Sequence, residues 1–290
     1  MDGKGESARP KTVSAPDVRI VVPQTRQEAP PVCFDLDSRP PIAPIAGGAL
    51  DSSQLTLEAG DGNRFRAFRA RAANPSGAAI LVLPDVRGLH PYYEELALRF
   101  AENGVDALAI DWFGRTAGST ERDDGFEYMP HVNQTRWDSI VDDIRAGVAA
   151  IRADGRATSI FTIGFCFGGR VSFDAATLGL GLAGVVGFYG IPAGEYRSGI
   201  PAPSEIANDI ECPVLGIFGG SDRAISAEMT KGFEEALDIA NVEHQVVVEP
   251  GAPHSFFDRK AEEFADASAR AWTTTLGFVR SHTSAPAGAG

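Results

Sequence analysis

The stretch that decides the fold is GFCFGG, residues 164–169. It follows an apolar, β-rich run at residues 158–163 and precedes a segment that can turn helical. A strand that turns sharply into a helix and lifts one side chain above the sheet is a nucleophile elbow, with the pattern G-x-nucleophile-x-G. Its glycines are needed because neighbouring backbone comes very close to the turn. The stretch therefore predicts an elbow with Cys166 at its tip.

A cysteine at this tip suits nucleophilic chemistry. A thiol ionises more readily than a hydroxyl, and the positive end of the helix that starts there stabilises the thiolate. The alternative is an inert, buried residue, because free cysteine is among the most buried residue types. The position of Cys166 between a strand and a helix favours the nucleophile.

Strand-like and helix-like segments alternate along most of the chain. We expect strands at residues 54–58, 65–72, 79–84, 105–110, 158–163, 183–188, 214–218 and 245–248. We expect helices at residues 92–103, 137–153 and 227–239, directly after the elbow, and from about 260 to 282. The first two strands read as an antiparallel pair, and the later alternation predicts parallel strands with right-handed crossovers. The predicted class is α/β: an α/β-hydrolase fold, with a mostly parallel central sheet and helices on both faces.

The length of 290 residues fits one large domain with tails. We expect residues 1–48 to form an N-terminal extension that is at least partly flexible. Residues 49–283 form the α/β-hydrolase domain, and residues 284–290 a disordered end. Residues 33–48 carry apolar and charged residues among prolines, so they are either disordered or extended across the folded body.

Charge and cysteine content exclude several classes of protein. With 26 basic and 39 acidic residues the net charge is −13, which argues against nucleic-acid binding. An anionic substrate would need a local group of arginines. Cys33, Cys166 and Cys212 are widely spaced and odd in number, so they indicate no disulfide framework and no zinc site. We expect a cytoplasmic protein without a signal peptide, a membrane span or a bound metal.

Two further residues complete a catalytic pattern. Asp222 follows the strand at 214–218, and His254 follows the strand at 245–248. Nucleophile, acid and histidine follow this order in the α/β-hydrolase layout, and the carboxyl ends of parallel strands meet at one edge of the sheet. Taken alone, an aspartate after two glycines is commonly a turn residue, and a single histidine is unremarkable. The joint pattern predicts a triad of Cys166, His254 and Asp222.

An oxyanion hole should accompany this triad. Its donors are the backbone N–H of Phe167, directly after the nucleophile, and one from the loop at residues 85–88. In that loop we expect Val86 to be the donor.

The motifs resemble those of the dienelactone hydrolase family, the carboxymethylenebutenolidases, over about residues 54–282. The resemblance is carried by GFCFGG at 164–169, LPDVRG at 83–88, DWFGR at 111–115, GGSD at 219–222 and PHSF at 253–256. It implies a hydrolase that opens an unsaturated, carboxylated lactone during aromatic-compound breakdown, without a cofactor. It also implies the roles of nucleophile for Cys166, orienting acid for Asp222 and base for His254.

The resemblance implies further site residues. In the family an acidic side chain after the third strand contacts the resting cysteine. Asp85 lies there, although the family typically has glutamate. The family also binds the substrate carboxylate through arginines, one of them shortly after the histidine, which suits the bidentate geometry of a guanidinium. The candidates in this chain are Arg259, Arg87, Arg115 and Arg136.

The sequence therefore predicts a hydrolase that opens a lactone or cleaves a small ester through a cysteine thioester. We expect a small-molecule substrate, with or without a carboxylate, and a monomer or small homo-oligomer. One alternative is a general carboxylesterase or a lactonase of other specificity. The other is a non-catalytic ligand-binding or redox module that uses Cys166.

Overall fold

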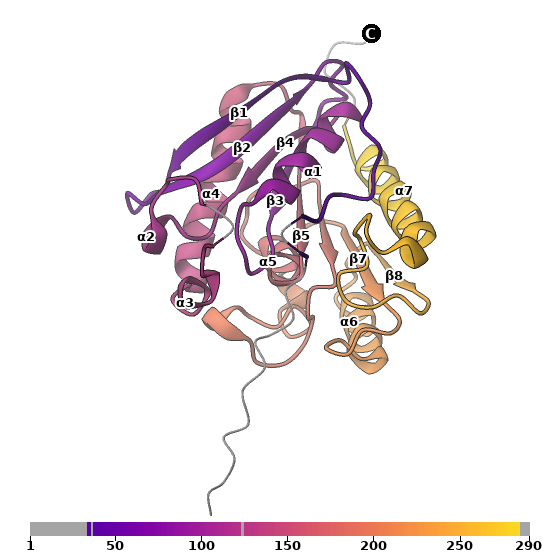
Figure 1. The fold of residues 1–290 in the computed structure, drawn as a ribbon. Coiled ribbons are helices and arrows are strands. Elements are labelled where there is room, and N and C mark those ends of the chain that lie inside the picture. The colour runs from indigo at the N-terminus through magenta and orange to yellow at the C-terminus, as the bar shows by residue number, and fades with distance from the viewer. Residues whose placement is uncertain (1–33, 36, 123–124, 285–290) are drawn as a thin grey trace, which may run out of the picture. The chain divides into compact units, whose positions relative to one another are not determined.

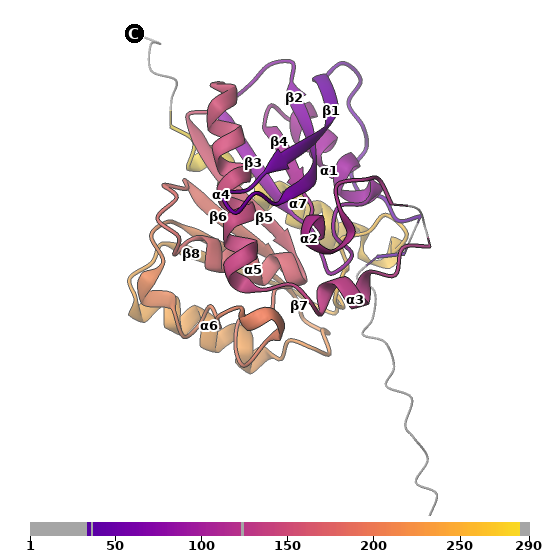
Figure 2. The same ribbon diagram turned by 90° about the vertical axis from the view of Figure 1, so that its left-hand side faces the viewer.

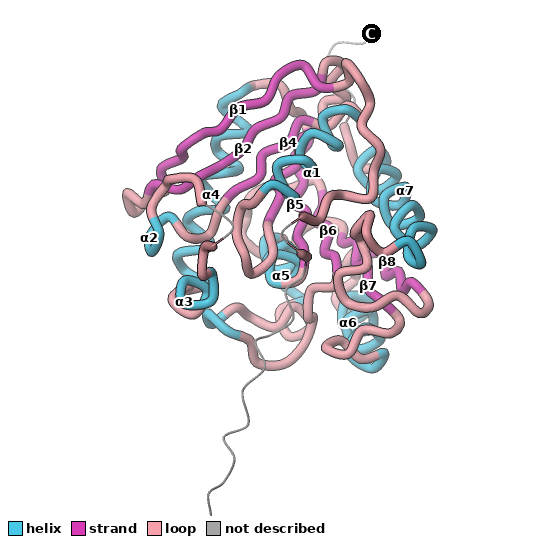
Figure 3. Tube along the Cα trace, viewed as in Figure 1, coloured by secondary structure: helices cyan, strands magenta, loops and turns pink. Residues whose placement is uncertain are grey.

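The computed structural model describes residues 34–35, 37–122 and 125–284 of the chain. Within this part, eight strands form one sheet in the order β1-β2-β4-β3-β5-β6-β7-β8. The strands are β1 (Ala49–Glu58), β2 (Arg64–Ala72), β3 (Ala78–Leu83), β4 (Asp106–Ile110), β5 (Ser159–Phe165), β6 (Gly184–Phe188), β7 (Val214–Gly219) and β8 (His244–Glu249). β1 and β2 pair antiparallel, as do β2 and β4, and the other neighbours are parallel. Figures 1 and 3 show β1 at one side of the sheet and β8 at the other.

Helices lie on both faces of the sheet. The longer ones are α1 (Pro91–Glu102), α4 (Trp137–Asp154), α5 (Phe167–Ala175), α6 (Ala227–Ile239) and α7 (Ala265–Ser281), and the short ones are α2 (Gly114–Ala117) and α3 (Tyr128–Val132). Figure 2 shows α4 and α5 in front of the strands, with α7 behind them. None of the helices in the described part of the chain is long and apolar enough to cross a membrane.

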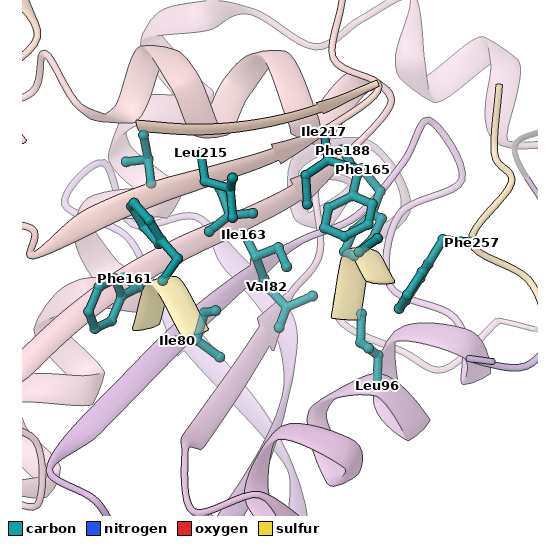
Figure 4. Close-up of a cluster of buried hydrophobic side chains, with 14 of the residues drawn as sticks. Ile80, Val82, Leu96, Phe161, Ile163, Phe165, Phe188, Leu215, Ile217 and Phe257 are labelled. Atoms are coloured by element: carbon teal, nitrogen blue, oxygen red, sulfur yellow. The ribbon is translucent and has the colours of Figure 1, made fainter. Parts of the chain in front are cut away.

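The central strands explain this layering. All six residues of β3 are buried, as expected for a parallel strand covered on both sides. Ile80 and Val82 pack in the cluster that contains residues of α1 and α7, part of which is drawn in Figure 4. Leu81 and Leu83 point to the opposite face and pack with residues of α4. The predicted α/β-hydrolase fold, with a mostly parallel sheet and helices on both faces, is confirmed.

Two predicted starts differ from the structure by about five residues. β1 begins at Ala49 instead of residue 54, because its exposed first residues pair with β2 without showing an apolar alternation. The last helix was expected from about Lys260, but α7 begins at Ala265 after a 3₁₀ turn at Glu262–Phe264. The side chain of Asp258 accepts a hydrogen bond from the N–H of Lys260 at 3.0 Å, and such a local bond favours a turn over a helix.

The expected N-terminal extension is described only from Phe34. Residues 1–33 and 285–290 lie outside the described part, so the predicted boundaries at 48 and 284 stay predictions. Phe34 itself is 2% exposed, and its ring stacks on Tyr92 of α1 with centroids 4.0 Å apart. Residues 37–48 then run along α1 to the start of β1 (Figure 1), so this stretch is packed against the folded body.

Candidate active site

The elbow is built at the junction of β5 and α5. Cys166 has φ 53° and ψ −110°, a backbone conformation that costs a non-glycine residue about 1–3 kcal/mol. Its N–H donates to the Phe188 carbonyl of β6 at 3.0 Å, and its carbonyl accepts from the N–H of Gly169 at 3.0 Å. Both bonds fix the turn, which places the sulfur at the N-terminus of α5.

The glycines of the elbow are required by main chain that passes beside them. A Cβ on Gly164 would lie 1.8 Å from the carbonyl oxygen of Gly168. One on Gly168 would lie 2.1 Å from the carbonyl oxygen of Leu83, at the end of β3, and one on Gly169 would lie 2.5 Å from that of Phe188. The elbow is therefore wedged between the ends of its two neighbouring strands, where no side chain fits.

We expect Gly168→Ala to lower the free energy of unfolding by about 2–3 kcal/mol, because main chain must move to admit the methyl group. Urea denaturation measures this change. The matched control is Gly277→Ala in α7, where an added Cβ meets nothing within 4 Å and alanine has the higher helix propensity. An unfolding free energy of Gly168→Ala equal to that of the wild type would contradict the close approach.

Asp222 and His254 are hydrogen-bonded to each other. Nδ1 of His254 lies 2.6 Å from Oδ2 of Asp222, whose side chain is completely buried. The other carboxylate oxygen accepts the N–H groups of Ala224 at 2.8 Å and Ile225 at 3.2 Å. With both oxygens held, the carboxylate is fixed and can orient the imidazole.

The sulfur of Cys166 lies on the other side of this imidazole. Burial alone lowers the pKa of His254, but its hydrogen bonds to Asp222 and Cys166, and the charges of both, raise the pKa to about 10. The structure thus brings the three residues together, with the imidazole between a carboxylate and a sulfur. An imidazolium in this place stabilises a thiolate.

The loop between β3 and α1 is rigidly held beside the elbow. The indole N–H of Trp112 donates to the Pro84 carbonyl at 3.2 Å, and the N–H of Leu89 donates to Asp111 at 2.9 Å. Val86 lies between these two anchors, and the approach of Gly168 to Leu83 and Pro84 brings the loop against α5. The N–H of Phe167 belongs to the first residue of α5, where no helical carbonyl can accept it.

Asp85 and Arg87 belong to a buried cluster with His90. Oδ1 of Asp85 accepts the N–H of Arg87 at 2.8 Å and lies 3.8 Å from Nε2 of His90, while Oδ2 has no hydrogen-bond partner within the described chain. The guanidinium of Arg87 donates to the Phe34 carbonyl and lies 3.2 Å from Nδ1 of His90. Burial lowers the pKa of His90, although Asp85 opposes this effect. Arg87 is therefore already hydrogen-bonded to the N-terminal segment.

Arg115 is engaged with two carboxylates. Its guanidinium lies 2.8 Å from Asp61, in the β1–β2 turn, and 2.6 Å from Asp143 of α4. Burial raises the pKa of Asp143 to about 6, even with this cation beside it. Removing Arg115 would leave a buried carboxylate without its counter-charge, so the arginine is committed to this pair.

The other two candidates lie on the surface. Arg136 precedes α4 and pairs with Asp138 at 3.1 Å, and both side chains are mostly exposed. Arg259 donates its backbone N–H to the Arg39 carbonyl at 3.3 Å and lines a hollow between α1 and residues 39–44. Their contacts are thus with residues other than Cys166, His254 and Asp222.

Sequence reasoning missed Arg122. Its side chain is 8% exposed and lies 2.6 Å from Oδ2 of Asp111, the same aspartate that holds Leu89. The rings of Phe113 and Phe126 lie 5.4 Å and 4.7 Å from the guanidinium carbon. Nε and Nη1 are buried and have no hydrogen-bond partner among the residues described. The DWFGR motif indicated Arg115 instead, and no local pattern marks a pair between residues 111 and 122.

Sequence reasoning also missed the buried Arg170 of α5. Its guanidinium donates to carbonyl groups of the loop after β6, at Ile191, Ala193, Gly194, Ile200 and Pro201. The ring of Tyr196 in this loop lies 4.8 Å from that guanidinium and 6.2 Å from the ring of Phe167. Trp112 lies 5.7 Å from Phe167. Arg170 thereby fixes an aromatic group beside the first residue after the nucleophile.

The sheet order, the elbow after β5, and the acid and histidine loops after β7 and β8 define an α/β-hydrolase fold. A sequence model of the dienelactone hydrolase family matches residues 65–283, and the chain belongs to this family. The predicted resemblance is therefore confirmed, and the protein is a hydrolase.

Similar proteins carry the same description. A protein of Salmonella typhimurium named "Putative carboxymethylenebutenolidase" is 29% identical over 239 residues, which cover 79% of this chain and 88% of the relative. One of the same name from Yersinia pestis is 27% identical and covers 76% and 85%. The crystal structure of a "Putative Dienelactone Hydrolase" from Klebsiella pneumoniae is 26% identical, with a TM-score of 0.68 over 79% of this chain and 98% of that one.

The contact between His254 and Cys166 predicts a thiolate near neutral pH. Because the pKa of His254 is raised to about 10, the imidazolium persists at neutral pH. Cys166 should then react with iodoacetamide at a rate that changes little between about pH 6 and pH 9. His254→Ala removes this cation, so the rate should instead rise through about pH 8.5, the ordinary pKa of cysteine.

The reaction with iodoacetamide is measured in a Cys33→Ser variant, so that the observed alkylation is that of Cys166. Cys212 is an internal control, because burial raises its pKa to about 12 and it should stay unlabelled. A wild-type profile that coincides with the His254→Ala profile would contradict the proposed ion pair.

Proposed function

We propose that this hydrolase opens lactones or cleaves small esters through a thioester acyl-enzyme on Cys166. The observation that supports this most directly is the imidazole of His254, which is hydrogen-bonded to both Asp222 and Cys166. In this proposal Cys166 is the nucleophile, His254 the acid and base, and Asp222 the residue that orients it.

Acylation begins with attack of the Cys166 thiolate on the ester or lactone carbonyl carbon. The carbonyl oxygen takes up the negative charge and accepts hydrogen bonds from the N–H groups of Val86 and Phe167. As this intermediate collapses, the bond from carbon to the ring or alcohol oxygen breaks. The imidazolium of His254 donates its proton to that oxygen, which leaves an alcohol, or a hydroxyl on the opened chain, and a thioester.

Deacylation uses the same residues, with His254 now acting as a base. Neutral His254 takes a proton from water, and the resulting hydroxide attacks the thioester carbonyl. The bond from carbon to sulfur breaks, and Cys166 returns to the thiolate paired with the imidazolium. The carboxylic acid is released and gives its own proton to solvent. Asp222 holds the ring in one orientation through both steps.

We propose that the aromatic side chains packed beside the residue after Cys166 favour a flat acyl group. Trp112 and Tyr196 both lie against Phe167, and Val86 belongs to the same apolar cluster. A conjugated lactone ring is planar and apolar on its faces, so it can pack against such rings. A role in aromatic-compound breakdown and a cytoplasmic location both fit this proposal and stay predictions.

A carboxylate on the substrate would need a cation near the oxyanion loop. We propose Arg122 for this contact, because two of its nitrogen atoms are buried without a hydrogen-bond partner in the described residues. Its partner Asp111 also holds Leu89, three residues after Val86. Arg87 and Arg115 are already engaged by Phe34 and by two carboxylates.

The nucleophile is tested by Cys166→Ala, which should lower kcat on lactones and on p-nitrophenyl acetate by roughly 10³-fold or more. Cys166→Ser should retain weak activity at most, because an alkoxide forms less readily than a thiolate. Circular dichroism shows whether both variants keep the fold. Full activity of a folded Cys166→Ala protein would end the thioester mechanism, and wild-type protein that binds but turns over no ester would favour a binding or redox module.

The cation is tested by Arg122→Met with paired substrates, a lactone with a free carboxylate and its methyl ester. We expect kcat/KM to fall about 10- to 100-fold for the carboxylate and to change little for the methyl ester. The control is Arg136→Met at an exposed pair, which should affect neither substrate. Equal losses on both substrates would show that Arg122 only supports the fold.

A further inference from the structure

Residues 34–35 and 37–48, which we call the strap, touch both loops of the proposed catalytic apparatus. They precede the region matched by the family model, at 65–283. The β3–α1 loop carries Val86, and the β8–α7 loop carries His254. Figure 1 shows the strap in indigo, running along α1 before it enters β1.

On the oxyanion side, the strap holds Arg87. The carbonyl of Phe34 accepts a hydrogen bond from this guanidinium, which is 7% exposed. A buried guanidinium needs acceptors, and the Phe34 carbonyl supplies one beside Nδ1 of His90, which lies 3.2 Å from the same guanidinium. Since Arg87 follows Val86 directly, the strap carbonyl restrains the residue next to the proposed oxyanion donor.

On the histidine side, the strap holds the residues after His254. The hydroxyl of Ser38, which is 1% exposed, donates to Asp258 at 2.6 Å, and the N–H of Arg259 donates to the Arg39 carbonyl at 3.3 Å. Lys260 also pairs with Asp35 and Asp37, but these acidic side chains are 78% exposed and add little. Ser38 is therefore the main polar anchor on this side.

Phe34 links the two sides through Tyr92. Its ring stacks on Tyr92, whose hydroxyl donates to the Phe257 carbonyl at 2.6 Å. Phe257 lies three residues after His254. Between them, Ser255 has φ 60°, a left-handed conformation that persists only where the surroundings hold it.

The strap contacts the α/β domain at several separate points along its length. Beyond Ser38 it passes over a hollow of about 330 Å³ that is lined by residues 39–44, Arg99, Asp258 and Arg259. Two of its later contacts reach α1: Arg39 pairs with Glu95 at 2.7 Å, and the N–H of Ile45 donates to Glu102 at 2.9 Å. The contacts of Phe34 and Ser38 can thus be changed separately from the far end.

We propose that the strap is a positioning element of the active site, which uses Phe34 and Ser38 to fix the His254 loop against the oxyanion loop. The inference rests on the proposed function, in which His254 and Val86 act on one carbonyl group. Phe34 and Ser38 are positioning residues, because they act through Tyr92, Arg87 and Asp258. A displacement of about 1 Å at reacting groups can cost up to roughly 100-fold in rate.

The test compares Phe34→Ala and Ser38→Ala with wild type in the full chain. We expect kcat on p-nitrophenyl acetate to fall about tenfold for Phe34→Ala and about threefold for Ser38→Ala, with KM within about twofold. Phe34→Leu keeps an apolar side chain over Tyr92 and should restore part of the loss. The matched control is Glu102→Gln at the far end, which should leave kcat unchanged.

A second readout separates positioning from stability. If Phe34 positions His254, the alkylation of Cys166 near neutral pH slows in Phe34→Ala and its pH profile moves toward that of His254→Ala. A lower Tm with wild-type kcat and a wild-type profile would overturn the proposal, as would equal losses in Glu102→Gln. If wild type turns over no ester or lactone, the proposed function fails, and the alkylation profiles still decide the role of the strap.

Discussion

The candidate site depends on how closely main chains approach one another around the elbow. The tip residue lies between the ends of β3 and β6, and carbonyl oxygens of both strands occupy the space that side chains at 168 and 169 would need. This approach sets the turn of Cys166 and the start of α5. It also brings the β3–α1 loop beside the first amide of that helix. The proposed nucleophile and the proposed oxyanion donors therefore depend on the same close approach of main chain, which explains why glycines stand on both sides of Cys166.

The charges of Asp222 and His254 determine the electrostatics around Cys166. The carboxylate of Asp222 is buried with both oxygens occupied, so it can stabilise a positive imidazole in a place that otherwise disfavours charge. Burial and hydrogen bonding oppose each other at His254, and hydrogen bonding prevails. The proposed pair of imidazolium and thiolate differs from a serine site, where the resting base is neutral.

The sequence was sufficient for the parts that local patterns encode. The elbow, the strands, and the positions of Asp222 and His254 each follow from a short motif beside an apolar run, and the structure places these two side chains 2.6 Å apart. Their catalytic roles stay predictions. The partners of the arginines could not be predicted in this way. Arg115 meets Asp61 across the sheet edge and Asp143 on α4, and only the folded chain shows that both carboxylates converge on it. The predicted start of α7 was wrong because the side chain of Asp258 forms the turn before the helix. The apolar periodicity of the sequence does not reveal this turn.

The strap and Arg87 illustrate how an extension and a core residue depend on each other. A guanidinium one residue after the proposed oxyanion donor is buried, and burial without an acceptor would cost several kcal/mol. The carbonyl of Phe34 supplies that acceptor, and its ring covers Tyr92. Without the strap, this guanidinium would lose that acceptor and keep its contact with Nδ1 of His90 at 3.2 Å. The buried guanidinium of Arg87 is therefore coupled to a segment that precedes the region matched by the family model.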